Sequence, residues 1–246
     1  MTREASLPGT PANFIQSRQN PRMRIRPISP FRFSARRATL GAVLLAIGVG
    51  AAAEAPPTAA IGADEIVADH SQSEWSEAYL QWIAAFARDN SPVSDATGTL
   101  CAAKQEGEVW FLAMSDGTAP AVRTCAVPAG KILFVPIAVT MERSGNKEPD
   151  CGSMARIAAD TLSHHVSRLS MTVDGLAVDN LASYRVATGD CFALGLRQVP
   201  RSAARAAVAD GYFVMLKPLA PGPHAIAVGA RFDSTLLSTT YRLDVR

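Results

Sequence analysis

The stretch CAAKQEGEVWFLAMSDGTAPAVRTCAVPAGKILFVPIAV, residues 101–139, holds two cysteines, two strongly apolar runs and two turn sequences. Its first apolar run, 109–113, is rich in β-branched and aromatic residues. The second run, 132–139, is almost wholly apolar, so both faces of a strand there should be buried. Ser-Asp-Gly at 115–117 and Pro-Ala-Gly at 128–130 are typical turn sequences. The stretch therefore predicts the central strands of an all-β domain, with a disulfide near the strand ends.

Further strands are predicted on the C-terminal side of this stretch. Asp174-Gly175 lies between two alternating segments, as a two-residue type I′ hairpin turn requires. Other strand patterns cover 122–127, 184–187, 192–196, 211–216, 224–229 and 240–245. The last two should pair antiparallel, and Pro136, which lacks an N–H, requires a bulge or an unpaired edge. Together these patterns predict a mainly β fold, an antiparallel β-sandwich of the jelly-roll or immunoglobulin-like kind with one or two packed helices.

Two helices are expected beside these strands. The first should begin after Ser71 or Ser73 and continue to about Arg88, and a second is predicted over 153–167. The first helix carries an aromatic stripe on one face, formed by Trp75, Tyr79, Trp82 and Phe86. This stripe is expected to dock on the β core. The alternative is a carbohydrate-binding platform.

Residues 1–53 differ from the rest of the chain and are interpreted as a targeting segment. They hold eight Arg and one acidic residue, followed at 41–53 by an apolar run too short to cross a hydrocarbon core of about 30 Å. Basic residues, a short apolar run and small residues at its end predict a secretory signal cleaved after Ala53. The Arg36-Arg37 pair leaves both general and twin-arginine export open, and Met23 is an alternative start to Met1. A retained N-terminal anchor is the competing reading.

The remainder of the chain is expected to comprise a linker, 54–70, and a single disulfide-stapled β-rich domain, 71–246. Subtracting the residues of the targeting segment from the 24 basic and 22 acidic side chains of the whole leaves 16 and 21, a net charge of −5. A mildly acidic body offers no electrostatic footprint for nucleic acid or an anionic membrane. We therefore expect a periplasmic or secreted bacterial protein with no nucleic-acid partner and no membrane span once the signal is removed.

The four cysteines, Cys101, Cys125, Cys151 and Cys191, all follow the predicted signal. In an oxidising compartment they should form disulfides, for which three connectivities are possible. We favour Cys101–Cys125 and Cys151–Cys191, because this pairing closes the shortest loops. A zinc site is the competing use, and the spacing disfavours it because no two cysteines form a C-x2-4-C pair.

No familiar catalytic or cofactor motif is present in the sequence, so no cofactor is predicted. Glu106 and Glu108, with Asp95 nearby, are candidates for the paired carboxylates of a glycosidase. Asp160 and His164 share a helix face and could form a metal half-site or an oriented base; a surface ion pair is the simpler reading. The acidic cluster Asp64, Glu65, Asp69 and His70 could bind a cation, but a solvated leader is favoured.

The central stretch also carries a resemblance. The pattern Asp95-x2-Gly98-x2-Cys101-x3-Gln105-x-Gly-x-Val-Trp-Phe-Leu-Ala, then Arg123-x-Cys125 and the Pro-x-Gly-Lys that follows, resembles a group of exported bacterial proteins of uncharacterised function. The later Asp210-Gly-Tyr and Leu-x-Pro-Gly-x-His224 segments fit as well, whereas Met114 stands where the pattern has Gly. The resemblance covers most of 73–245. It implies export, disulfides and a β domain, and it carries no catalytic residue across.

Two functions are compatible with these patterns. The first is a non-enzymatic binding or envelope-associated protein, whose partner could be an envelope component, a glycan or a small molecule. Its recognition surface would combine the polar 141–152 loop with the aromatic helix. The second is a secreted hydrolase that uses Glu106 and Glu108, or the Asp160/His164 pair.

Overall fold

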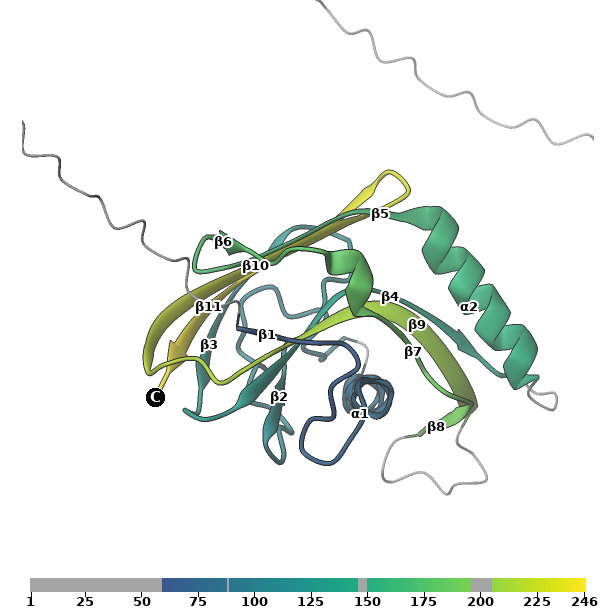
Figure 1. Cartoon of the computed structure of the whole chain (residues 1–246), viewed down its shortest axis with the longest axis horizontal. Coiled ribbons are helices and arrows are strands. Elements are labelled where there is room, and N and C mark those ends of the chain that lie inside the picture. Colours follow the sequence, from purple (N-terminus) through teal and green to yellow (C-terminus); the bar gives the residue numbers. More distant parts are fainter. Residues whose placement is uncertain (1–58, 88, 146–149, 196–204) are drawn as a thin grey trace, which may run out of the picture. The chain divides into compact units, whose positions relative to one another are not determined.

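Two β-sheets and two α-helices make up the described part of the protein, shown in Figure 1. The computed structural model describes residues 59–87, 89–145, 150–195 and 205–246. The predicted signal segment, 1–53, lies outside these residues. None of the described helices is long and apolar enough to cross a membrane.

The elements follow one another in a mainly β order, as the sequence predicts. The helices are α1 (Gln72–Ala84), α2 (Cys151–His165) and the 3-10 turn η1 (Leu181–Tyr184). The strands are β1 (Ala60–Ile61), β2 (Val109–Phe111), β3 (Ala121–Val127), β4 (Ile132–Arg143), β5 (Val166–Val173), β6 (Leu176–Ala177), β7 (Arg185–Ala187), β8 (Phe192–Leu194), β9 (Arg205–Leu216), β10 (Gly222–Phe232) and β11 (Thr235–Val245).

The first sheet is organised around the two long strands β4 and β9, which pair antiparallel. β2 pairs parallel with β4, while β1, β7 and β8 all pair antiparallel with β9. The register of β4 on β9 shifts between Pro136 and Ala138, which confirms the bulge expected at the proline. This shift places Ile137 and Ala138 on the same core, so the long strand bends without exposing its apolar side.

The second sheet has the order β3-β11-β10-β5-β6. β10 and β11 pair antiparallel over their whole length, as predicted, but β3 joins β11 in parallel. The β5–β6 hairpin turns at Asp174 and Gly175, whose φ angles of 51° and 82° are those of a type I′ turn. The strands of the opening stretch are therefore divided, β2 and β4 in one sheet and β3 in the other.

The main hydrophobic core lies between the two sheets. β3, β10 and β11 supply alternate side chains to it, among them Cys125, Ile226 and Tyr241, while β4 and β9 supply Val135 and Val214. A second core covers the opposite face of the first sheet, beneath α1. The molecule thus has three layers in this region, α1, the first sheet and the second sheet (Figure 1).

Helix α1 begins where its capping residues predict. The Ser71 side chain accepts a hydrogen bond from the Glu74 N–H, and the Glu74 carboxylate accepts one from the Ser71 N–H, which completes a capping box. Its stripe faces inward: Tyr79 is fully buried against Phe134 and Phe213, and Trp82 donates its indole N–H to the Ala103 carbonyl. Each buried aromatic side chain contributes about 1.5–3 kcal/mol by leaving water.

Helix α2 leads directly into β5 and packs against β4 and β9 (Figure 1). The Thr140 hydroxyl donates to the Ala158 carbonyl at 2.8 Å. Arg185 of β7 holds the Asp210 carboxylate with Nη2 at 2.7 Å and also donates to the Ala159 carbonyl. Because the buried Asp210 carboxylate holds the Arg185 guanidinium in place, the hydrogen bond from Arg185 to Ala159 secures the helix to the first sheet.

The sequence predicts a linker over 54–70, yet its described part is folded with the domain. Ala60 and Ile61 pair with Leu216 and Met215 of β9, and both Ile61 and Val67 are buried in the core beneath α1. The Pro- and Ala-rich composition concealed a short edge strand, because two residues are too few to show a period.

Both predicted disulfides are present. Cys101–Cys125 joins the segment before β2 to β3, with Cα atoms 5.7 Å apart, and so links the two sheets. Cys151–Cys191 joins the first residue of α2 to the segment between β7 and β8, with Cα atoms 5.5 Å apart. Each closes a loop whose constraint stabilises the fold by about 3–4 kcal/mol in the chain-entropy account.

Gly98 illustrates how tightly the edge of β3 is covered. Its φ is +93°, and a Cβ there would lie 2.6 Å from the Thr124 carbonyl oxygen and 2.8 Å from the Thr124 nitrogen. Thr124 in turn donates its N–H to the Thr97 carbonyl. The edge of β3 is thus paired by a turn that only glycine can form.

We predict that Gly98→Ala lowers the free energy of unfolding by about 3 kcal/mol, from backbone strain plus the clash with Thr124. Gly130→Ala is the matched control, because Gly130 has a φ of +83° but open space around its Cβ position. Strain alone should cost about 1 kcal/mol there. Equal losses for the two variants in urea unfolding would show that the close approach at Gly98 contributes nothing.

Candidate functional site

The glycosidase candidates all lie in the segment that precedes β2. Glu106 and Glu108 are both exposed, in the turn before β2. The Asp95 carboxylate instead caps its own turn, accepting hydrogen bonds from the N–H groups of Thr97, Gly98 and Leu100. Partial burial would raise the pKa of Asp95, but these bonds outweigh it and hold the pKa below its ordinary value. Asp95 is therefore a structural carboxylate that stays ionised at neutral pH.

The Asp160/His164 pair is on an exposed face of α2, and the two side chains are not joined. His164 Nδ1 lies 2.7 Å from the main-chain oxygen of Asp160, not from its carboxylate. The neighbouring His165 contacts Asp233 at 2.9 Å and stacks on Phe232. These contacts fix the end of α2 against the β10–β11 hairpin.

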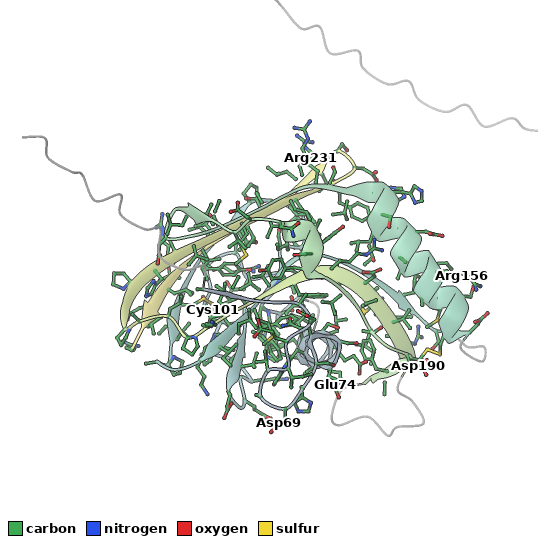
Figure 2. All side chains as sticks on the ribbon, viewed as in Figure 1. Asp69, Glu74, Cys101, Arg156, Asp190 and Arg231 are labelled. Atoms are coloured by element: carbon green, nitrogen blue, oxygen red, sulfur yellow. A yellow bond between two sulfur atoms is a disulfide. The ribbon has the colours of Figure 1, made fainter. Side chains whose placement is uncertain are left out.

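The acidic leader is likewise not assembled into a metal centre. The Glu65 carboxylate accepts the Gly62 N–H, and His70 lies 3.9 Å from Glu74. In the described residues, the one group of three potential ligand atoms is Cys151, Asp190 and Cys191, and two of these atoms are already bonded in a disulfide. Figure 2 shows Asp69 and Glu74 at the outer side of α1, close to solvent.

The predicted recognition surface is only partly available. The aromatic face of α1 is packed into the second core, so the carbohydrate-platform reading of the stripe is wrong. Residues 141–143 belong to β4, Asp150 caps α2, and 146–149 lie outside the described residues. The aromatic part of the predicted surface is therefore occupied by packing, whereas Arg143, Gly145, Asp150 and Gly152 of the segment 141–152 are exposed.

A buried arginine, Arg123 of β3, is the most unusual group in the domain. Only 2% of its surface is exposed, and its recorded hydrogen bonds all go to main-chain carbonyls. Nε donates to Asp95, Nη2 to Val93, and Nη1 to Ala113 and Met114. A buried guanidinium is stable only when its N–H groups are satisfied, and here the segments before and after β2 satisfy them.

Two tyrosines surround the same cluster. Tyr241 donates its hydroxyl to the Ala113 carbonyl at 2.6 Å, and the Tyr79 hydroxyl accepts the Met114 N–H at 3.0 Å. Burial raises the pKa of Tyr241 to about 12, against the opposing charge of Arg123. Burial also raises the pKa of Tyr79. Both phenols therefore remain neutral, as structural hydrogen-bonding groups.

A small cavity adjoins Arg123, with an empty volume of about 210 Å³ that includes some open solvent. Its walls are Trp82, Pro92, Asp95, Gly98, Cys101, Phe111, Leu112, Ala113 and Arg123. The space that a water-sized probe can enter is enough for about one water molecule beside the buried charge of Arg123.

The sequence holds one indication that Arg123 is buried, namely its position in the alternating pattern of β3. Arg123 alternates in phase with Cys125 and Val127, and all three face the interior. A disulfide cysteine and a valine on one face of a strand indicate the buried face, and the same alternation puts the Arg123 side chain on that face. What the sequence could not supply was the set of carbonyls that accept its hydrogen bonds.

We predict that Arg123→Met lowers the free energy of unfolding by about 3 kcal/mol, because the buried carbonyl of Ala113 and the part-buried carbonyls around it lose their charged donor. Arg242→Met, at an exposed position of β11, is the matched control and should cost about 0.5 kcal/mol or less. Denaturant unfolding measures both. A loss at Arg123 no greater than at Arg242 would contradict the assigned role.

His224 joins two turns at the end of the second sheet. Its Nδ1 lies 2.7 Å from the Asp174 carboxylate and its Nε2 lies 2.8 Å from the Ala220 carbonyl, so both nitrogens face acceptors. Burial would lower the pKa of His224, but the bonds to Asp174 and Ala220 and the charge of Asp174 outweigh it, and the net pKa is raised. The doubly protonated imidazolium fits this position.

We predict that His224 stabilises the protein more at pH 5.5 than at pH 8.5. Because the folded pKa exceeds the ordinary 6.5, the contribution is complete below 6.5 and is lost as the pH rises through the folded value. The difference in Tm between wild type and His224→Gln should therefore shrink on going to pH 8.5. His164→Gln, on exposed α2, is the control, and a difference for His224→Gln that does not change with pH would contradict the prediction.

The outer face of the second sheet carries side chains that are exposed or half-buried. One row crosses all five strands in register: Val122, Thr240, Ala227, Thr172 and Ala177. The rows on either side hold Thr124, Arg242 and Ala225, and Ser238, Gly229 and Ser170. The helices α1 and α2 pack against other elements, mainly of the first sheet. These three rows are thus rich in small and hydroxyl side chains and carry one charge, that of Arg242.

Comparisons with known proteins add little to this geometry. No protein-family model and no curated protein matches the sequence. Among solved structures, the solution structure of amebosin matches over 52% of this chain and 96% of its own length, at 10% identity and a TM-score of 0.18. A match at this TM-score supports no argument about fold or function.

Proposed function

We propose that this protein is exported to the periplasm or the cell exterior, where it acts as a non-enzymatic binding protein for an envelope polysaccharide. The observation that carries the proposal is the outer face of the second sheet, where one row of side chains crosses five strands in register and a row on either side crosses three. A binding role requires a surface of this kind and no catalytic group. The polar side chains of Asp95, Arg123 and Asp210 are engaged in hydrogen bonds that hold the fold together.

Export is supported by two independent features. The N-terminal sequence has the basic, apolar and small-residue regions of a secretory signal. All four cysteines that follow it are joined in two disulfides, which persist in oxidising compartments and are rare in the cytosol.

A polysaccharide partner follows from the chemistry of the face. Hydroxyls of Thr124, Thr172 and Thr240 can donate and accept hydrogen bonds, as the hydroxyls of a sugar require. Neighbouring strands lie about 4.8 Å apart, so the rows present a regular array to a partner with a repeating structure. Arg242 adds one cation among these hydroxyls, which suits a glycan that bears occasional carboxylates.

We predict that Ala227→Glu, at the centre of the face, abolishes binding by placing a charged side chain among the hydroxyl rows. The probe is purified peptidoglycan, and the measurement is cosedimentation of the full chain. Ala155→Glu, on the exposed side of α2, makes the same change away from the face and should bind like wild type. The expected loss for Ala227→Glu is at least about tenfold, near the 1.4 kcal/mol that a tenfold change represents.

Three results would overturn the proposal. Wild type that fails to cosediment with peptidoglycan would exclude this polysaccharide as the partner. Equal binding by Ala227→Glu and wild type would exclude the outer face. Release of soluble sugar fragments by wild type would replace binding with hydrolysis, the alternative function.

A further inference from the structure

The Cys151–Cys191 disulfide occupies a different environment from its counterpart. Cys125 is 2% exposed and belongs to the main core, and Cys101 packs against that core. Cys101, Cys151 and Cys191 are all half-buried, but Cys151 and Cys191, unlike the other two cysteines, belong to neither core. Figure 2 shows Asp190 beside the N-terminal end of α2, at the margin of the domain. A thiol from solution can therefore reach this disulfide more readily.

The two sulfur atoms of this disulfide are also unequal. Cys151 is the first residue of α2, a helix of 15 residues, so its sulfur lies at the positive end of the helix dipole, where the Asp150 carboxylate caps only the Ser153 N–H. A helix N-terminus lowers the pKa of a cysteine thiol. Cys191 lies in the segment between β7 and β8 and has no such helix behind it. Cys151 is therefore the better leaving group.

Asp190 acts in the opposite direction. One of its carboxylate oxygens lies within 4.8 Å of both sulfurs, and Oδ1 accepts the Cys191 N–H at 2.7 Å. Its negative charge repels an approaching thiolate and disfavours a thiolate on either cysteine. The carboxylate slows the exchange without preventing access.

The helix stays attached when this disulfide is open. Ala158 and Leu162 are buried, and the hydrogen bonds from Thr140 to Ala158 and from Arg185 to Ala159 lie about two turns beyond Cys151. These contacts are independent of the sulfurs. The dithiol form is therefore a folded protein that can be oxidised again.

We infer that Cys151–Cys191 is a thiol-exchange site for a dithiol reductant. A thiolate of the reductant attacks Cys191 Sγ, the S–S bond breaks, and its electron pair leaves on Cys151 Sγ at the start of α2. The mixed disulfide on Cys191 is then attacked by the second thiol of the reductant, which becomes a disulfide, and Cys191 leaves as a thiolate. Two electrons pass to the protein, and the two cysteines take up the two protons that the reductant loses.

The test uses the oxidised full chain and limiting dithiothreitol at pH 7. Samples are quenched with acid, alkylated and analysed by peptide mass spectrometry. We expect Cys151 and Cys191 to be alkylated at least about tenfold earlier than Cys101 and Cys125, while circular dichroism shows that the fold is kept. Equal rates, earlier opening of Cys101–Cys125, or loss of the fold would overturn the inference.

A second arm tests the direction of attack. With glutathione, which cannot complete the second step within one molecule, the mixed disulfide should accumulate on Cys191. Accumulation on Cys151 would overturn the assignment of Cys151 as the leaving group.

A third arm tests the carboxylate. Asp190→Asn should accelerate the opening about fivefold, because it removes a negative charge that lies within 4.8 Å of both sulfurs and repels the attacking thiolate. Asp179→Asn, at another exposed carboxylate, is the matched control and should leave the rate unchanged. An unchanged rate for Asp190→Asn would show that Asp190 does not restrain the exchange. None of these arms depends on polysaccharide binding, so their failure and the failure of the proposed function are distinguishable.

Discussion

The buried guanidinium of Arg123 is the interaction on which the arrangement of the two sheets depends. β3 carries it in the second sheet, and its hydrogen bonds reach carbonyls in the segments that lead into and out of β2 of the first sheet. The N–H groups of a guanidinium buried away from water must donate to fixed acceptors, so the segments that supply these carbonyls have little freedom to move. The Cys101–Cys125 disulfide makes a second connection across the same boundary.

The other residues of the central pattern hold the same segments in place. The Asp95 carboxylate fixes its turn, and Gly98 lets that turn approach Thr124. The Gln105 side chain accepts the Phe111 N–H and donates to the Phe111 carbonyl, which pairs β2 along its open edge. A pattern that looks distinctive in sequence is thus explained by main-chain hydrogen bonding, and each of its polar residues has a structural task.

Local signals in the sequence predicted local structure well. The Ser71 cap, the inward aromatic stripe, the Asp174-Gly175 hairpin, the bulge at Pro136 and both disulfides are all present. The parallel pairing of β3 with β11 could not be predicted, because it joins segments more than 100 residues apart and no turn sequence links them. The carbonyl acceptors of Arg123 were hidden for the same reason, since a backbone oxygen leaves no mark in the sequence. The position of Glu106 and Glu108 close to Trp110 in the sequence makes them candidate catalytic carboxylates, and the fold leaves them exposed in a turn.

Native-state hydrogen exchange most directly tests whether the segments bonded to Arg123 open only when the whole domain unfolds. The amides to follow are those of Leu100, bonded to Asp95, Phe111, bonded to Gln105, and Thr124, bonded to the Thr97 carbonyl. If the hydrogen bonds of Arg123 hold the sheets together, these amides exchange only on global unfolding, with the same free energy as the amides of β9 and β10. Exchange of these three amides through a local opening, at a free energy well below that of β9 and β10, would contradict this account.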